Sequence, residues 1–292
     1  MRRETRSWIN TLTITFWVRA HESLCLESPM NTPRKIMLLV LGVLAVLALP
    51  TNSSAQDGPT PGTAPGASAG PAAPGSAGRN FTPDHPHNLA PYFAPATSSP
   101  KPPDKDGFLQ RWLLLEPINK PNRSNTVFTD SYVRNAFNTE SFPDQFTVVP
   151  HDGDKVMVAD QELAWHALDS SLFNVKLFRF ADGVKKQTYG VVFWAVTLVS
   201  SQREMKNVRL AVGSNSASMW WVNGQEAVGL FGDRRMVMDD CISKRLTLRQ
   251  GRNIIRGAVI NGPGLSDFCV RFIDEDGNPI KDLTMSLESG GN

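Results

Sequence analysis

The segment Val208–Gly224, VRLAVGSNSASMWWVNG, constrains the fold more than any other part of the chain. Apolar side chains alternate with small or polar ones from Val208 to Gly213, which is the two-residue period of a β-strand. The small, polar run Gly213–Ser218 suits a sharp connection, and Met219–Val222 predicts a second strand. Asn223-Gly224 follows, and this dipeptide is the strongest short-range signal for a type I′ turn. The segment therefore predicts a β-hairpin core with polar loops at its ends.

Similar short segments, rich in β-branched and aromatic residues, recur along the second half of the chain. Turn signals separate them, at Gln250-Gly251, Gly262-Pro263-Gly264 and Asp276-Gly277. No helical periodicity of comparable length lies between them, so we expect an all-β antiparallel β-sandwich rather than an α/β fold. Besides the two strands above, the expected strands are Phe108–Leu115, Thr188–Val199, Met236–Asp239, Ile242–Leu248, Asn253–Ile260 and Phe268–Ile273.

The segment Ser124–Asp160 is less regular than its surroundings. It contains a predicted helical turn near Val133–Phe137, and we expect the whole segment to cross one sheet of the sandwich. Asp152 and Asp154 offer oxygen atoms that suit calcium. Two carboxylates around one glycine are more typical of a solvated turn, and we favour that interpretation.

The N-terminal part of the chain has a targeting pattern. Arg34-Lys35, the apolar run Ile36–Leu49 and Ser53-Ser54-Ala55 match the three regions of a secretory signal peptide. The apolar run is short for a bilayer span of about 20 residues, so an exported protein is expected, in the periplasm, on the cell surface or outside the cell. The expected organisation is an upstream extension that fits nothing after it (1–29), a signal peptide (30–55), a disordered linker rich in Gly, Pro and Ala (56–104) and the β-sandwich (105–288).

Charge and cysteine content exclude several classes of site. The net charge is +2, and the sequence has no basic run of the kind that binds nucleic acid. The three cysteines lack the spacing of a zinc site, and no metal or cofactor is expected. Cys241 and Cys269 both fall in or beside expected strands of an exported domain, where a disulfide forms readily. Two separate buried thiols are the alternative.

The second half of the chain contains an ordered set of small, polar and aromatic residues: Gly213-Ser214-Asn215, Trp221-Val222-Asn223-Gly224, Arg234, Arg235, Asp239 and Gly251-Arg252-Asn253. Through this set the chain resembles the galactose-binding-like jelly-roll modules that accompany secreted polysaccharide-degrading enzymes. The resemblance covers about residues 107–283. Through the segments 110–118, 165–170 and 267–272 the chain is also similar to exported bacterial proteins labelled acetylxylan esterases. In these modules two acidic residues often occupy the position of Asn215-Ser216, so this chain carries less negative charge there.

The resemblance implies a non-catalytic carbohydrate-binding or accessory module in xylan breakdown. An acetylxylan esterase is the first alternative, although residues 105–288 contain no Gly-Xaa-Ser-Xaa-Gly motif. His166 and Asp169, with Ser170 or Ser171, provide the atoms of a catalytic triad, but they are close neighbours in sequence. A structural or protein-interaction module is the second alternative. The expected partners are a polysaccharide or oligosaccharide, and a catalytic domain or other protein.

Sugar recognition needs an exposed aromatic ring and a few polar groups that fix the hydroxyls. Trp220 and Trp221 are adjacent on a strand and must face opposite sides of the sheet, so one is a core residue and the other a stacking candidate. The alternative is that the outward ring is structural and lies beneath the Ser124–Asp160 segment. The sequence predicts core positions for the tryptophans at 112, 165 and 194.

Four polar residues lie in or beside the loops at the hairpin ends: Asn215, Arg234, Arg235 and Asp239. Loops at the ends of a sandwich are common binding sites. These residues are therefore ligand candidates together with the two tryptophans. An arginine–aspartate salt bridge that holds a loop is the structural alternative for them.

Overall fold

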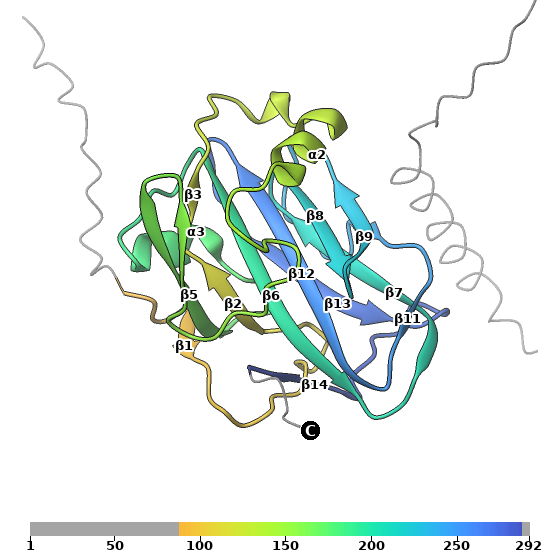
Figure 1. The fold of residues 1–292 in the computed structure, drawn as a ribbon. Coiled ribbons are helices and arrows are strands. Elements are labelled where there is room, and N and C mark those ends of the chain that lie inside the picture. Colours follow the sequence, from red (N-terminus) through yellow and green to blue (C-terminus); the bar gives the residue numbers. More distant parts are fainter. Residues whose placement is uncertain (1–87, 288–292) are drawn as a thin grey trace, which may run out of the picture. The chain divides into compact units, whose positions relative to one another are not determined.

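Two antiparallel sheets form the part of the chain that the computed structural model describes, residues 88–287 (Figure 1). The ten-stranded sheet contains β1 (Phe93–Pro95), β2 (Arg111–Leu115), β3 (Ile118–Asn119), β4 (Lys155–Val158), β5 (Gln161–Ser170), β6 (Val191–Ser201), β8 (Ala217–Val222), β9 (Gln225–Leu230), β12 (Gly251–Asn261) and β14 (Leu283–Ser286). The four-stranded sheet contains β7 (Met205–Ser214), β10 (Cys241–Ile242), β11 (Leu246–Leu248) and β13 (Phe268–Ile273). This confirms the predicted all-β sandwich.

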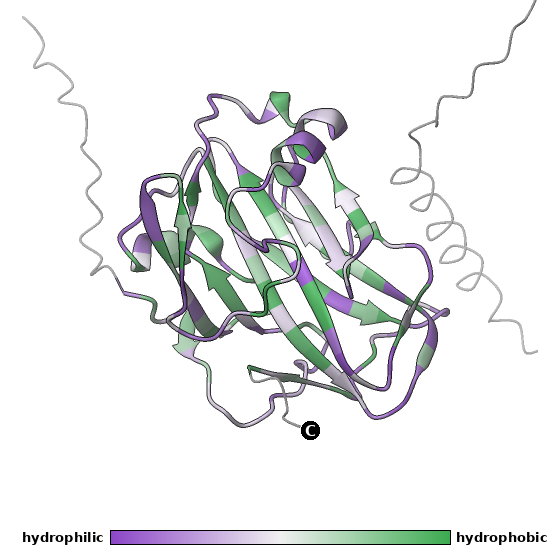
Figure 2. Ribbon diagram, in the orientation of Figure 1, coloured by the Kyte–Doolittle hydropathy of each residue, from purple (hydrophilic) through white to green (hydrophobic). Residues whose placement is uncertain are grey.

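Strands β6 and β12 form the centre of the large sheet. They pair along the whole of β12, from Gly251 opposite Ser201 to Asn261 opposite Val191. Their side chains are buried on both faces of the sheet, which explains why β6 reads as a nearly continuous apolar run. Hydrophobic residues concentrate in the strands and hydrophilic ones in the connections (Figure 2).

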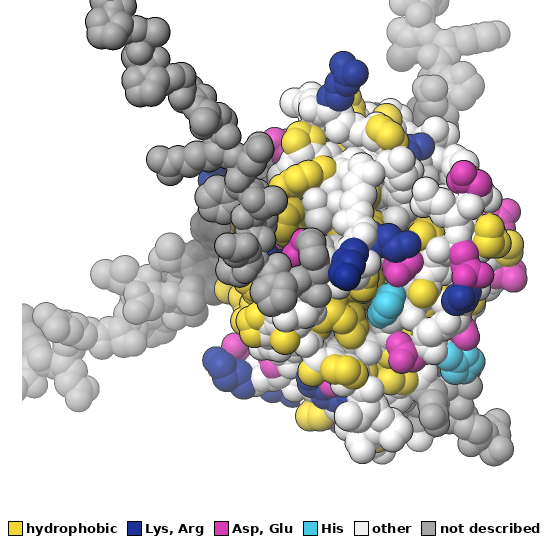
Figure 3. Space-filling model, turned by 90° about the vertical axis from the view of Figure 1, so that its left-hand side faces the viewer, with side chains coloured by type: hydrophobic (Ala, Val, Ile, Leu, Met, Phe, Trp, Pro, Cys, Tyr) yellow, Lys and Arg dark blue, Asp and Glu magenta, His cyan; other side chains and the backbone are white. Residues whose placement is uncertain are grey.

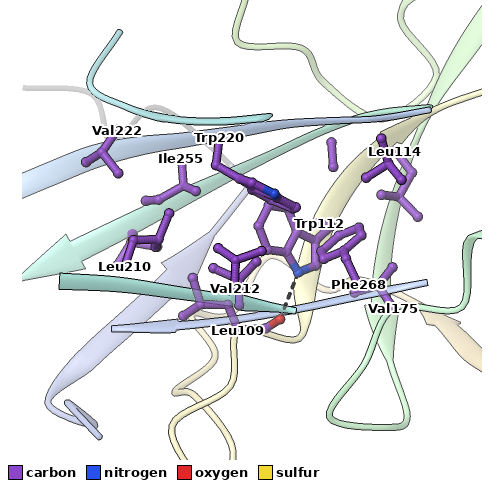
Figure 4. Close-up of a cluster of buried hydrophobic side chains, with 14 of the residues drawn as sticks. Leu109, Trp112, Leu114, Val175, Leu210, Val212, Trp220, Val222, Ile255 and Phe268 are labelled. Atoms are coloured by element: carbon purple, nitrogen blue, oxygen red, sulfur yellow. Dashed lines mark hydrogen bonds between the residues drawn. The ribbon is translucent and has the colours of Figure 1, made fainter. Parts of the chain in front are cut away.

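The inner core lies between the two sheets. Trp112, Trp220 and Phe268 meet there edge to face, with ring centroids 4.9 to 5.9 Å apart (Figure 4). The indole nitrogen of Trp112 donates to the carbonyl of Leu109 at 2.8 Å. The buried indole is thus satisfied, and its ring fills the space between the sheets.

A second core covers the outer face of the large sheet, where the segment between β3 and β4 crosses it. This segment contains a 3₁₀ turn (Asn125–Val127) and helix α2 (Asp130–Asn138), which begins after the N-cap Thr129. The buried side chains of the segment pack on three tryptophans of the sheet, Trp165, Trp194 and Trp221. The predicted excursion and helical turn are therefore present, and Trp112, Trp165 and Trp194 are core residues as predicted.

The predicted hairpin is wrong in its first half. Strands β7 and β8 belong to different sheets, because Asn215 and Ser216 carry the chain from one sheet to the other. The hairpin that forms is β8–β9, and its turn residues Asn223 and Gly224 have φ of 51° and 78°, as the turn signal predicts.

Other elements also differ from the sequence prediction, which contained neither β4 nor β5. Met236–Asp239 is a loop, in which Asp239 has φ of 55°. The segment Ile242–Leu248 divides into β10 and β11, which pair with separate parts of β7. A short helix, α3 (Leu177–Gly183), was not predicted, and it forms where Leu177, Phe180 and Ala181 enter the inner core.

The fold begins before the predicted boundary at residue 105. Strand β1 pairs with β5, and Phe93 is buried against Phe180 at 6.4 Å between ring centroids. The linker prediction is therefore wrong for residues 88–104, because Tyr92 and Phe93 supply apolar surface to the fold. The expectations for residues 1–87 lie outside the described residues. No helix within residues 88–287 is long and apolar enough to cross a membrane.

Candidate functional site

The two adjacent tryptophans face opposite sides of the large sheet, as predicted, and both are buried. Trp220 lies in the inner core, and Trp221 is only 7 % exposed. The Trp221 ring stacks on Trp194 at 5.9 Å and meets Phe146 edge to face at 5.3 Å. Trp221 is therefore a structural residue beneath the segment that crosses the sheet, as the alternative interpretation predicted. Neither tryptophan ring is exposed to a ligand.

The predicted polar residues gather where the loops 215–216, 231–240 and 262–267 meet, a region here named the loop end. The Asn215 amide donates to the carbonyl of Leu265 at 2.9 Å. Arg234 donates from Nε to Asp240 at 2.7 Å. Asp239 accepts from the guanidinium of Arg271, with Nε to Oδ1 at 3.0 Å. These contacts hold the loops together, as the structural alternative predicts.

Arg235 differs from these three residues. Its side chain is exposed, and no carboxylate or carbonyl of residues 88–287 lies within bonding distance of it. Arg235 therefore stays a ligand candidate from the sequence prediction.

His166, Asp169 and Ser170 do not assemble into a catalytic triad, as their close spacing in sequence led us to expect. His166 and Asp169 are three residues apart on β5 and so point to opposite faces of the sheet. Asp169 pairs with Arg111 at 2.8 Å. Ser170 Oγ donates to the carbonyls of Leu172 and Asn174, each at 3.0 Å.

Of the two alternatives left open for Cys241 and Cys269, a disulfide between them does not form, because Cys269 is a free thiol. Val212 of β7 pairs with Cys241 on one edge and with Val270 on the other, so the two cysteines flank β7. Strands that flank a third strand lie roughly 9 to 10 Å apart, whereas a disulfide requires Cα atoms within about 7 Å. Burial, together with the nearby Asp239 carboxylate, raises the pKa of Cys269 to about 12.

The Asp152–Asp154 loop is a turn that its own carboxylates stabilise. Asp152 accepts from the backbone N–H of Ala167 at 2.8 Å, and Asp154 accepts from that of His151 at 2.7 Å. Within residues 88–287 no group of three or more His, Cys, Asp or Glu side chains is arranged to hold a metal ion.

A polar hollow of about 450 Å³ lies between the end of β3, the beginning of β5 and the connection from α3 to β6. We name it the β5 hollow. It lies on the side of the molecule that carries β5 and α3 in Figure 1, where Figure 3 shows basic, acidic and histidine side chains gathered together. The lining residues are Pro117, Asn119, Gln161, Glu162, Lys185, Lys186 and Gln187.

The half-buried carboxylate of Glu116 joins elements around the hollow. Glu116, which follows β2, lies 3.1 Å from Lys186 Nζ and accepts from the Ala164 N–H at 3.2 Å. His166 Nε2 lies 3.4 Å from the other oxygen of Glu116, and the imidazole packs on Phe180 of α3. Strands β2 and β5 and the end of α3 are therefore joined through one side chain.

Tyr189 gives this side of the molecule its most exposed aromatic ring. The residue is 47 % exposed, more than any other Phe, Tyr or Trp of residues 88–287. Its carbonyl accepts from Nε2 of Gln187, which lines the hollow, at 2.6 Å. The ring contacts Phe178, and Arg179 lies over both Phe178 and Tyr92. Sequence reasoning missed Tyr189 because it assigned residues from Thr188 onward to a strand.

Comparisons with known proteins find no matching family model and no matching curated protein. Among solved structures, the chain is similar to a PA14 sugar-binding domain from an RTX adhesin, with 11 % identity, a TM-score of 0.34 and coverage of 61 % of this chain and 99 % of that chain. The PA14 domain of the antifreeze protein MpAFP gives 8 % identity and a TM-score of 0.33, with coverage of 66 % and 95 %. A β-glucosidase from Kluyveromyces marxianus gives 18 % identity and a TM-score of 0.28, with coverage of 46 % and 14 %. None of these similarities reaches a level from which a shared function follows.

Proposed function

We propose that this chain is an exported carbohydrate-binding accessory module and that sugar binds at the β5 hollow. The observation that carries the proposal is a hollow lined by amide and charged side chains, one of which, Gln187, donates to the backbone carbonyl of the exposed residue Tyr189. Sugars are bound by such a combination, because a ring packs on the apolar face of the pyranose while polar groups fix its hydroxyls.

The walls of the hollow suit hydroxyl recognition. Asn119, Gln161 and Gln187 bring amides, which both donate and accept hydrogen bonds. Glu162 is held by Lys155 at 2.6 Å, and Lys186 is held by Glu116. These ion pairs position the charged groups before a ligand arrives, which reduces the entropic cost of binding.

Xylan is the polysaccharide we propose, and export is the proposed destination. Both rest on the sequence: the resemblance to modules of polysaccharide-degrading enzymes, and the signal-peptide pattern before residue 56. The loop-end residue Arg235 is the competing location for the sugar.

Calorimetry of the purified full chain with xylo-oligosaccharides tests the proposal. We expect Tyr189→Ala to weaken binding roughly three- to tenfold, because an aromatic contact contributes about 0.5 to 1.5 kcal/mol. Leu172→Ala is the matched control, since Leu172 is 40 % exposed and does not line the hollow. Equal affinities for wild type and Tyr189→Ala would place the sugar elsewhere.

The same preparations distinguish the alternatives. Release of acetate from acetylated xylan that disappears in His166→Ala would establish an esterase instead. Absence of both binding and acetate release would leave a structural or protein-interaction module.

A further inference from the structure

The ionic side chains of the β5 hollow are not balanced. Glu162, which lines the hollow, is already paired with Lys155 at 2.6 Å, and Lys186, which also lines it, is paired with Glu116 at 3.1 Å. Lys185 lines the same hollow, and no carboxylate of residues 88–287 lies within 4.0 Å of its ammonium group. The hollow thus presents one cation without a counter-ion from the described residues.

The backbone at Lys185 is unusual for a residue with a side chain. Its φ is +58°, in the left-handed region, immediately after α3. The N–H of Lys185 donates to the Asp182 carbonyl at 3.0 Å, and the N–H of Lys186 donates to that of Ala181 at 2.9 Å. Glycine is the usual residue where a helix ends in this way, because it has no Cβ to clash. A strained non-glycine residue that lines a hollow is an indication of function.

We propose that Lys185 makes the β5 hollow selective for anionic sugars, which carry a carboxylate or a sulfate group. This inference rests on the proposed function and specifies its ligand. A lysine is a compact point charge that pairs with either anion. Lys155 and Lys186, which are paired with Glu162 and Glu116, reduce the repulsion of an anionic ligand by these two carboxylates. The alternative is that Lys185 only interacts favourably with the C-terminal end of α3, which would not affect ligand preference.

Three oligosaccharides of equal backbone length test the proposal by calorimetry with the full chain: neutral xylohexaose, the same backbone bearing glucuronic acid, and a sulfated form. We expect the wild type to bind one or both anionic forms roughly three- to fivefold more tightly than the neutral form, as suits an exposed ion pair. Lys185→Gln is expected to remove this preference, so that anionic and neutral forms bind equally, whereas Lys185→Arg keeps it. Lys244→Gln, an exposed lysine outside the hollow, is the control.

The outcomes separate this inference from the proposed function. Equal affinity of the wild type for neutral and anionic forms, or a preference that persists in Lys185→Gln, overturns the anionic selectivity alone. A wild-type chain that binds none of the three overturns the proposed function and the selectivity together. The preference for the glucuronic acid form over the sulfated form, or the reverse, identifies the anion. A higher salt concentration is expected to weaken the binding of the anionic oligosaccharides and not that of the neutral one.

Discussion

Lys185 is a residue where stability and binding are expected to oppose each other. Lys185→Gly removes the Cβ from a backbone at φ of +58°, so we expect the free energy of unfolding in urea to rise by about 0.5 to 1 kcal/mol. The same change removes the cation from the hollow and should abolish any preference for anionic sugars. If Lys185→Gly were less stable than wild type, the backbone at this position would not be strained by the side chain.

Cys269 is expected to be chemically inert in the folded protein. A thiol with its pKa raised to about 12 is ionised at pH 8 in roughly one molecule in ten thousand, and the residue is 1 % exposed. Because thiolate is the reactive form, labelling at Cys269 should stay negligible at pH 8, rise as the pH approaches 12, and become fast in denaturant. Peptide mapping after a timed iodoacetamide pulse checks this. Rapid native labelling at Cys269 would show that the strand β13 is open to solvent.

At the scale of elements, the segment between β3 and β4 is part of the core. Phe142 is buried between Trp165 and Trp194, with ring centroids 6.1 and 5.9 Å away. We expect Phe142→Ala to lower the free energy of unfolding by about 3 to 5 kcal/mol, as measured by urea denaturation. Met157→Ala is the control, because Met157 is 54 % exposed and should change stability by less than about 0.5 kcal/mol. A small effect at Phe142 would mean that the segment is only loosely attached.

Sequence patterns predicted those elements whose structure leaves a direct mark on neighbouring residues. The apolar run of β6 and the Asn223-Gly224 turn were predicted because burial on two faces and a left-handed turn leave direct marks in the sequence. The assignment of β7 and β8 to different sheets was not predicted, since Asn215-Ser216 reads equally well as a hairpin turn or as a crossing between sheets. Helix α3 was missed for a similar reason: it is 7 residues long and depends on tertiary burial.

At the scale of the whole domain, the candidate site was harder to predict than the fold. The walls of the β5 hollow come from segments near residues 117, 161 and 186, which only the folded topology brings together. The sequence drew attention to Trp220 and Trp221, yet the second core buries the outward ring. The sequence offered an arginine–aspartate salt bridge as the structural alternative for Arg234 and Asp239. It did not identify their partners, which are Asp240 and Arg271.

Two locations for sugar thus compete across the molecule, the β5 hollow and the loop end around Arg235. An NMR titration of the ¹⁵N-labelled chain with a xylo-oligosaccharide distinguishes them most directly. We expect the amide shifts to change at Asn119, at Gln161 and Glu162, and from Lys185 to Tyr189. Shifts confined to residues 231–240 and 262–267 would contradict the account and place the binding site at the loop end.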